Sequence, residues 1–239
     1  KKEDKAFGTG SVKIQYVDSV PDICMTNVAP AGSVVKTAQG MESGTWTKDN
    51  ITFNVEIKDA YIGVKKVSFR LDGAELPGKE LFYEDDSIPK ETVSRSFDVD
   101  TSAGDAQGHT FEVTATNAKG VSATWTGYIL LDKDAPVIGG LRIADTGEQV
   151  ANTTYKRPVT LTTTVTDAVS SLAAVKYNVT KDDESTQTIT VTADENNPSQ
   201  YSCSFDQDGA YKVSVSAEDK AGNTVRSTEE VAFRVDGAG

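Results

Sequence analysis

Four aspartates, Asp132, Asp134, Asp167 and Asp219, have the clearest capacity for chemistry in this sequence. Asp132 and Asp134 lie in a short polar segment before a proline, while Asp167 and Asp219 each follow a run of alternating apolar residues. Calcium binds six to eight oxygen ligands, and carboxylates supply most of the neutralising charge. If the fold brings these side chains together, they form a candidate Ca²⁺ site. The alternative is that each aspartate only caps its own turn through local hydrogen bonds.

The other reactive side chains do not form a catalytic set. His109 is the only histidine, and neither Cys24 nor Cys203 has a histidine near it in the repeat described below. A cysteine nucleophile needs a neighbouring base or a lowered pKa. The sequence also has no glycine-rich phosphate loop and no nucleophile elbow. We therefore predict no catalytic residue and no enzyme activity, and we expect two unpaired thiols.

The charge of the chain excludes several classes of partner. Its 239 residues include 24 Lys and Arg against 36 Asp and Glu, which gives a formal net charge of -12. Such a surface repels phosphate backbones, so we expect no nucleic-acid partner. No apolar run approaches the roughly 18 residues that a membrane-spanning helix needs, so we expect no membrane insertion. We expect the chain to be a monomer.

The sequence contains an internal repeat. Residues 48–60 align without a gap with residues 156–168 at an offset of 108, and residues 111–117 align with residues 213–219 at an offset of 102. The two offsets differ by six residues, which places a change of length in the loops between the aligned blocks. The chain therefore contains two diverged copies of a unit of about a hundred residues.

The apolar pattern within each unit predicts strands. Residues 51–57 alternate between apolar and polar side chains, as in a strand with one buried face. About seven such segments in a hundred residues are typical of an immunoglobulin-like sandwich. We predict an all-β chain with two tandem immunoglobulin-like β-sandwich domains, residues 18–132 and 133–239. Residues 1–17 are then the tail of a preceding repeat or a first strand.

Two motifs resemble a known family. Residues 208–223, Asp-Gly-Ala-Tyr-Lys-Val-Ser-Val-Ser-Ala-Glu-Asp-Lys-Ala-Gly-Asn, resemble the penultimate strand and turn of bacterial immunoglobulin-like (Big-type) repeats of cell-surface and adhesin proteins. The junction Asp-Lys-Asp-Ala-Pro at residues 132–136 resembles the start of such a repeat. Tyr211 resembles a tyrosine corner, whose hydroxyl bonds to nearby backbone. The first unit departs from the pattern, because His109 stands in place of Tyr211.

This resemblance implies an extracellular location, at the cell surface, in the cell wall or secreted, with neighbouring repeats of a longer chain as partners. Related repeats in bacterial adhesins bind calcium at their joints. In such a sandwich, the loop after the second strand and the last hairpin both lie where the chain enters the domain. Asp167 and Asp219 occupy these loops, and Asp132 and Asp134 occupy the entering segment. We therefore predict that Ca²⁺ stiffens the joint between the two domains.

The first unit has a weaker version of this set. The residues that match are Asp18, Asp59 and Asn117, with at least one carboxylate fewer than in the second unit. Fewer negative ligands lower the affinity for a divalent cation. We therefore expect the first unit to bind calcium less readily.

The absence of catalytic chemistry and the repetition together favour a structural role. We predict a non-catalytic stalk or spacer that presents a distal adhesive or other module. One alternative makes the domains themselves an adhesin that binds a host protein or glycan. An exposed Trp125 would then be a candidate contact, although we expect this side chain to fill the core. Another makes them accessory domains of a secreted glycan-active enzyme, because a fold of this kind serves many tasks.

Overall fold

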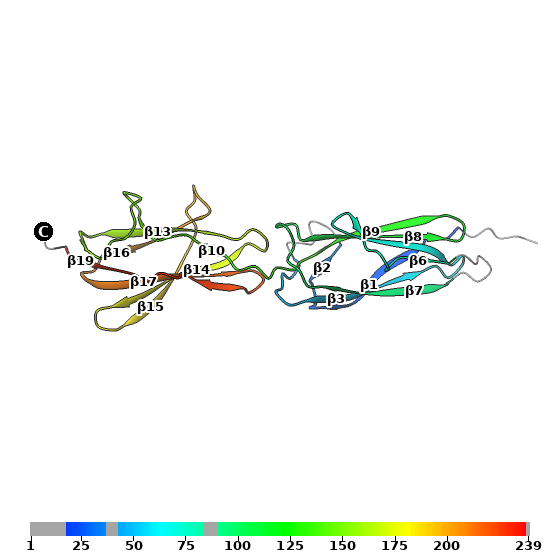
Figure 1. Ribbon diagram of the computed structural model, residues 1–239, viewed down its shortest axis with the longest axis horizontal. Coiled ribbons are helices and arrows are strands. Elements are labelled where there is room, and N and C mark those ends of the chain that lie inside the picture. The colour runs from blue at the N-terminus through cyan, green and yellow to red at the C-terminus, as the bar shows by residue number, and fades with distance from the viewer. Residues whose placement is uncertain (1–17, 37–42, 84–89, 238–239) are drawn as a thin grey trace, which may run out of the picture.

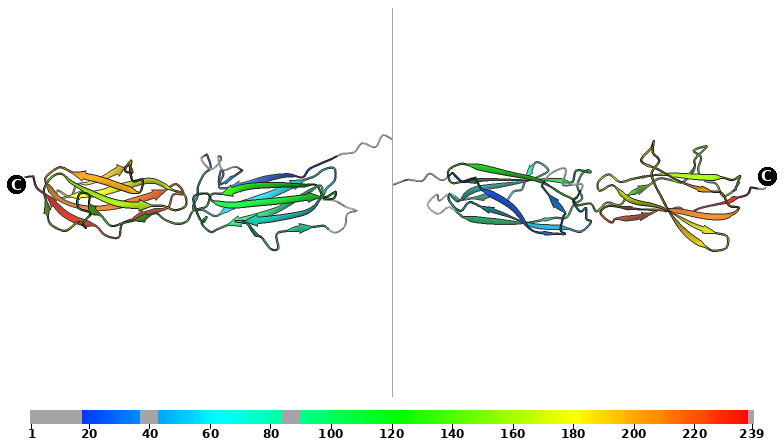
Figure 2. Two further views of the ribbon diagram at one scale, coloured as in Figure 1. Left: turned by 90° about the horizontal axis from the view of Figure 1, so that it is seen from above. Right: turned by 180° about the vertical axis from the view of Figure 1, so that it is seen from behind.

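The protein forms two β-sandwiches that lie end to end (Figure 1). The computed structural model describes residues 18–36, 43–83 and 90–237. Within these ranges every regular secondary-structure element is a β-strand. Figure 2 shows the same extended arrangement from two further directions. The prediction of an all-β chain of immunoglobulin-like sandwiches is confirmed.

The first sandwich has a three-stranded and a six-stranded sheet among its described residues. Its strands, in chain order, are β1 (Asp22–Ala29), β2 (Val34–Val35), β3 (Ile51–Lys58), β4 (Val64–Leu71), β5 (Ala74–Glu75), β6 (Leu81–Phe82), β7 (Thr92–Val99), β8 (His109–Asn117) and β9 (Ser122–Ile129). One sheet has the order β1-β3-β7, and the other has the order β2-β9-β8-β4-β5, with β6 also paired to β4. All of these strand pairs are antiparallel.

The second sandwich has a similar topology, but one of its strand pairs is parallel. Its strands are β10 (Val137–Ile138), β11 (Arg142–Ile143), β12 (Thr154–Tyr155), β13 (Val159–Thr166), β14 (Leu172–Lys181), β15 (Thr186–Val191), β16 (Gln200–Phe205), β17 (Gly209–Asp219), β18 (Thr224–Arg226) and β19 (Val231–Val235). β13 pairs with β10, β11 and β16 in one sheet, and the other sheet has the order β12-β19-β17-β14-β15, with β18 on β17. β3 and β13 are equivalent strands, as are β8 and β17, in agreement with the two alignments.

Aromatic side chains fill the first core. Phe53 and Phe97 extend from the three-stranded sheet and meet Phe69, Phe111 and Trp125 from the other sheet. Ring centroids in this group lie 4.9–6.4 Å from their neighbours, in the range where aromatic pairs attract. Trp125 is only 8% exposed. The alternative in which Trp125 is an exposed contact is therefore wrong, because its indole completes the core.

The second domain contains a tyrosine corner. The hydroxyl of Tyr211 donates to the carbonyl oxygen of Gln207 at 2.7 Å, while its ring stacks on Phe233. The predicted corner is thus confirmed. In the first domain His109 is buried at the equivalent position, and its two ring nitrogens lie 2.7 Å from Asp72 Oδ2 and 2.8 Å from the carbonyl oxygen of Thr101. His109 is therefore a packed structural residue.

Residues 1–17 lie outside the described residues, so their assignment stays a prediction. Cys24 is exposed on β1, whereas Cys203 is buried on β16 of the other domain. The two thiols are not bonded to each other.

Candidate metal centre

Asp132 is fixed to the first domain by its backbone. Its neighbour Leu131 forms a parallel bridge with Thr47, and the N–H of Asp132 donates to the carbonyl oxygen of Thr47 at 2.9 Å. The next residue, Lys133, donates from its backbone N–H to Ser102 Oγ. Asp132 is completely buried. Asp132, which the first sandwich holds through its backbone, therefore carries a carboxylate into the joint.

Asp167 and Asp219 belong to the second domain. Asp167 directly follows β13, and Asp219 is the last residue of β17, before the hairpin to β18. Both strands point their ends towards the first domain, so the two loops meet the entering chain. The Lys48 ammonium also crosses the joint and donates to the carbonyl oxygen of Gly222 in that hairpin, at 2.8 Å.

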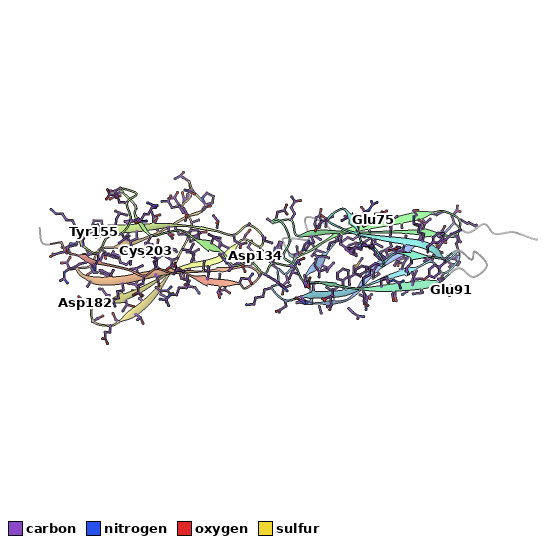
Figure 3. The ribbon with its side chains drawn as sticks, in the orientation of Figure 1. Glu75, Glu91, Asp134, Tyr155, Asp182 and Cys203 are labelled. Carbon is purple, nitrogen blue, oxygen red and sulfur yellow. The ribbon has the colours of Figure 1, made fainter. Side chains whose placement is uncertain are left out.

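The structure brings together three of the four predicted ligands. One carboxylate oxygen from each of Asp132, Asp167 and Asp219 lies within 4.8 Å of the others. Ligands 2.3–2.6 Å from one calcium ion can be at most about 5 Å apart, so this spacing fits a shared ion. Asp134 is not in this set, because its side chain is exposed at the joint (Figure 3). Its backbone N–H, rather than its carboxylate, contacts Asp132 Oδ1 at 2.9 Å.

Each of the three aspartates also caps a turn. Asp167 Oδ1 accepts hydrogen bonds from two backbone N–H groups of its own loop, at 2.7 and 3.2 Å. Asp219 accepts from the N–H and the side-chain amide of Asn223, and the same amide reaches the carbonyl oxygen of Asp132. The local role that the sequence left open is therefore present. It does not explain why three carboxylates meet, since one capping residue does not need the other two.

Ser170 is a member of the site that the sequence analysis missed. Its backbone N–H donates to Asp132 Oδ2 at 3.0 Å. Its hydroxyl is buried and has no hydrogen-bond partner among the described residues. A serine in a Ser-rich loop carries no sequence signal of this kind, because its role depends on how that loop meets Asp132.

The equivalent place in the first domain has a different composition. Ser19 Oγ donates to Asp59 Oδ1 at 2.6 Å, and Asn117 Nδ2 donates to Asp59 Oδ2 at 3.1 Å and to the carbonyl oxygen of Ser19. Asp18, which was predicted to belong to this set, is exposed and is replaced by Ser19. One carboxylate with two neutral donors is satisfied without a cation. The described residues thus include one set with three carboxylates and one set with a single carboxylate.

The pKa of Asp167 reflects the three-carboxylate arrangement. Burial raises the pKa of Asp167 above its usual value, and the negative charges of Asp132 and Asp219 raise it further. The hydrogen bonds from its own loop offset only part of this effect. Without a cation, a charged Asp167 therefore destabilises the fold.

The pKa of Asp59 shifts in the opposite direction. Burial alone would raise it, but hydrogen bonds from Ser19, Ile62, Asn117 and Tyr61 stabilise the carboxylate and leave the pKa of Asp59 below its usual value. The charged form of Asp59 therefore stabilises the first domain.

These opposite shifts predict opposite effects of two equivalent substitutions. In chelator at pH 7, Asp167→Asn should raise the free energy of unfolding of the second domain, and Asp59→Asn should lower that of the first. The gain from Asp167→Asn should shrink as the pH falls through the raised pKa of Asp167 and should vanish near pH ~4, where Asp167 is protonated in both states and resembles the amide. The loss from Asp59→Asn should begin to shrink only below about pH 4, where Asp59 is protonated in the unfolded chain, and should vanish below the lowered pKa of Asp59 in the folded state. Urea unfolding of each domain from pH 3 to 8 measures both. Effects of the same sign at pH 7 would contradict this account.

Comparison with known proteins places the second sandwich in a family. Residues 134–237 match the family described as bacterial Ig-like domain. The second domain is a bacterial Ig-like domain. No curated protein matches the chain. Domains of this family typically have no catalytic activity and serve as surface or accessory modules.

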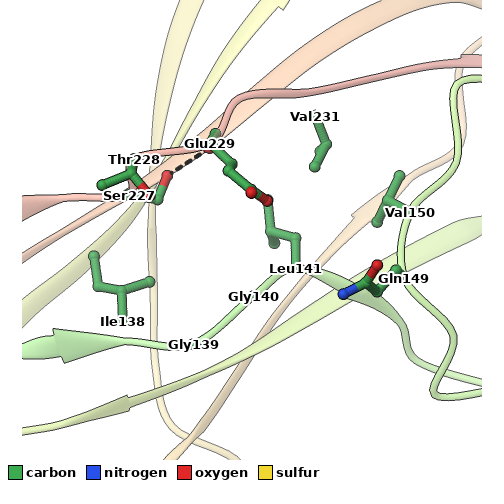
Figure 4. Close-up of a pocket in the computed structure, with 10 residues that line it drawn as sticks. All are labelled: Ile138, Gly139, Gly140, Leu141, Gln149, Val150, Ser227, Thr228, Glu229 and Val231. Atoms are coloured by element: carbon green, nitrogen blue, oxygen red, sulfur yellow. Dashed lines mark hydrogen bonds between the residues drawn. The ribbon is translucent and has the colours of Figure 1, made fainter.

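The bacterial Ig-like domain also contains a surface cavity of about 260 Å³ (Figure 4). It lies where the segment from β10 to β11 faces the segment between β18 and β19. Its lining combines glycine backbone and apolar side chains with Gln149 and Glu229. The Ser227 hydroxyl donates a hydrogen bond to the carbonyl oxygen of Glu229. Glu229 is the only carboxylate in this lining, so the cavity offers no pair of acidic groups for acid–base chemistry.

No helix of the described residues is long and apolar enough to cross a bilayer.

Proposed function

We propose that this chain is a non-catalytic stalk or spacer segment of a bacterial cell-surface or secreted protein, with a joint that Ca²⁺ stiffens. The observation that carries the proposal is the position of Asp132. Its backbone is held by Thr47 of the first domain, and its carboxylate lies beside Asp167 and Asp219 of the second. An ion bound by all three carboxylates would tie the two domains together.

The charge and burial of the site support a cation. Asp132 and Asp219 are at most 1% exposed, so water screens their repulsion poorly. The described surroundings of the three carboxylates include backbone N–H groups and the Asn223 amide, but no ion pair with them occurs among the described residues. A divalent cation would remove the repulsion and satisfy the remaining oxygen lone pairs. The chemistry that the ion supplies is structural, through neutralisation and cross-linking.

The composition of the link between the domains supports a stiff connection, which a stalk needs. The link from Asp132 to the first residue of β10, Val137, is short, and it contains Pro136 and no glycine. Lys48 and Asn223 add hydrogen bonds at the joint. A short link with few soft residues restricts bending, so the reach of such a chain grows with the number of domains.

Residual dipolar couplings test the proposal directly. With 10 mM CaCl₂ the two domains should report one common alignment tensor, whereas in chelator the tensors should differ because the joint bends. The Asp219→Asn protein in calcium should behave like the wild type in chelator. Asp134→Ala is the matched control, because its side chain lies outside the carboxylate set, and it should behave like the wild type. Tensors that are the same with and without calcium would contradict a calcium-stiffened joint.

A further inference from the structure

β15 is a free edge of the second domain. It is the terminal strand of its sheet and pairs only with β14 among the described residues. The hairpin that it forms with β14 extends away from the body of the sandwich (Figure 1). An unpaired edge exposes backbone donors and acceptors to which another strand can bind.

The register of the hairpin identifies which backbone groups are free. Pairs in an antiparallel ladder alternate between those that exchange hydrogen bonds and those that do not. The N–H of Lys181 donates to the carbonyl oxygen of Ser185 at 3.0 Å, so the pair they form is hydrogen-bonded. Continuing from that pair, the N–H and C=O groups of Thr186, Thr188 and Thr190 point away from β14. The outward backbone groups of these three alternate residues can therefore pair with a further strand.

This edge lacks the protection that the first domain has. β15 consists of Thr-Gln-Thr-Ile-Thr-Val, with no charge and no proline. The equivalent part of the first domain is broken into β5 and β6, of two residues each, with Pro77 and Gly78 between them. Interrupted edges of this kind prevent strand addition. At this position in the sandwich, the described residues form an uninterrupted edge in the second domain and an interrupted one in the first.

A cavity lies beside the inner face of β15. It has a volume of about 150 Å³ and a mixed lining. Val179 of β14, Ile189 of β15 and Phe205 of β16 form its apolar part, while Lys181 and Asp206 are charged residues at the same cavity. A cavity of this size can hold a small side chain that contacts the apolar part of the lining. In strand addition, backbone hydrogen bonds provide affinity, while pockets for alternate side chains provide specificity.

The two ends of β15 are acidic. Asp182, Asp183 and Glu184 are exposed in the turn before it, and Asp194 and Glu195 are exposed after it. Asp182 lies towards the end of the domain that is remote from the joint (Figure 3). Antiparallel pairing of β15 with a second copy of itself would bring one acidic end against the other, which is unfavourable. Basic residues at both ends of a partner strand would instead complement these charges.

We propose that β15 is a docking edge for an extended segment of another protein. The segment adds as a strand along Thr186, Thr188 and Thr190 and places an apolar side chain in the cavity lined by Ile189 and Phe205. Its short uncharged stretch is flanked on both sides by Lys or Arg. This inference does not depend on the calcium-stiffened joint.

The test uses the whole chain and a synthetic peptide. The probe is Lys-Lys-Thr-Val-Thr-Val-Thr-Lys-Lys, blocked at both ends, and the control peptide has Glu in place of each Lys. Binding is followed by fluorescence anisotropy, and amide hydrogen exchange by NMR shows where the peptide binds. We expect the Lys peptide to bind more tightly than the Glu peptide and to protect the amides of Thr186, Thr188 and Thr190.

Two substitutions at one position separate the backbone from the side chain. Thr188→Pro removes an outward N–H and should weaken binding at least about tenfold. Proline is tolerated at such an edge position, since that N–H has no partner in the fold. Thr188→Val keeps the backbone and should bind within about twofold of the wild type. If Thr188→Pro fails to fold, the double variant Asp194→Asn/Glu195→Gln provides the test, because it should weaken binding of the Lys peptide alone.

Several results would overturn the proposal. These are the absence of binding at 1 mM peptide, equal binding by the Thr188→Pro protein, and equal binding of the Lys and Glu peptides. Self-association of the chain that Thr188→Pro abolishes, without peptide binding, would assign the edge to a second copy instead.

Discussion

Calcium at 10 mM should raise the melting temperature of the second domain by roughly 6–20 °C relative to chelator. Extracellular calcium modules have dissociation constants of about 10⁻⁴–10⁻³ M, and a ligand that binds only the folded state then adds about 1.4–2.7 kcal/mol to the free energy of unfolding. Each kcal/mol shifts the melting temperature of a domain of this size by about 4–8 °C. The second domain should respond most, because Asp167 and Asp219 are both in its loops. Differential scanning calorimetry measures the shift.

The Asp219→Asn variant tests the calcium ligand at this position. In chelator its free energy of unfolding should lie within about 1 kcal/mol of the wild-type value, because the relief of repulsion among three carboxylates is offset by the loss of one of the two hydrogen bonds from Asn223. The variant should also lose the response to calcium. The amide at this position copies Asn117 in the first domain, where the set contains the single carboxylate of Asp59.

Two control proteins make the result specific. Asp134→Ala should keep the full calcium response, since its carboxylate is not in the set. Asp132→Ser/Asp219→Asn copies the set Ser19, Asp59 and Asn117 and should show no response. A wild-type protein whose melting temperature is unchanged by calcium would leave the aspartates as turn caps alone.

Sequence pattern predicted the fold because both signals for it, strand alternation and the internal repeat, can be read from the order of the residues. Alternating residues such as those of β3 define a strand with one buried face, and the repeat offset carries that assignment to β13. The fold class in turn predicts which loops meet at one end of the domain. The proximity of Asp167 and Asp219 could therefore be predicted from their positions in the repeat and from the fold class.

The details of the joint depend on turns that the pattern does not contain. Asp132 and Asp134 look equivalent in sequence, yet the N–H of Asp134 bonds to Asp132 and its own side chain is exposed. The first domain shows a similar shift by one residue. Asp18 was predicted to lie beside Asp59, but Ser19 lies there instead. Side-chain direction in a short link is set by its hydrogen bonds, and sequence spacing alone does not give it.

The two sandwiches have separate cores, which predicts separate unfolding. The first is formed by residues of β3 to β9 with partly buried residues of β1 and β2 around it, and the second is formed by residues from Leu141 onwards. The two cores share no residue. A substitution in one core should therefore destabilise that domain and leave the other almost unchanged, apart from coupling through the joint.

Phe111→Ala is the substitution with the largest expected effect on the first domain. Phe111 is 1% exposed, and its ring lies 5.2 Å from Phe53 and 5.0 Å from Phe97, measured between ring centroids. Truncation of a buried phenylalanine removes its transfer free energy and leaves a cavity, at a loss of about 3–5 kcal/mol. The melting temperature of the first domain should fall by at least about 12 °C.

Calorimetry in chelator distinguishes this outcome from a single cooperative unit. Two transitions should appear, of which Phe111→Ala moves only one. The neighbouring Thr110→Ala is the matched control, because the Thr110 side chain is exposed on the other face of β8 and its loss should change stability by less than about 0.5 kcal/mol. If Phe111→Ala lowered both transitions equally, the domains would unfold together and the joint would be far stronger than its hydrogen bonds indicate. With calcium bound, partial coupling of the two transitions is the expected result, because the ion would join Asp132 of the first domain to Asp167 and Asp219 of the second.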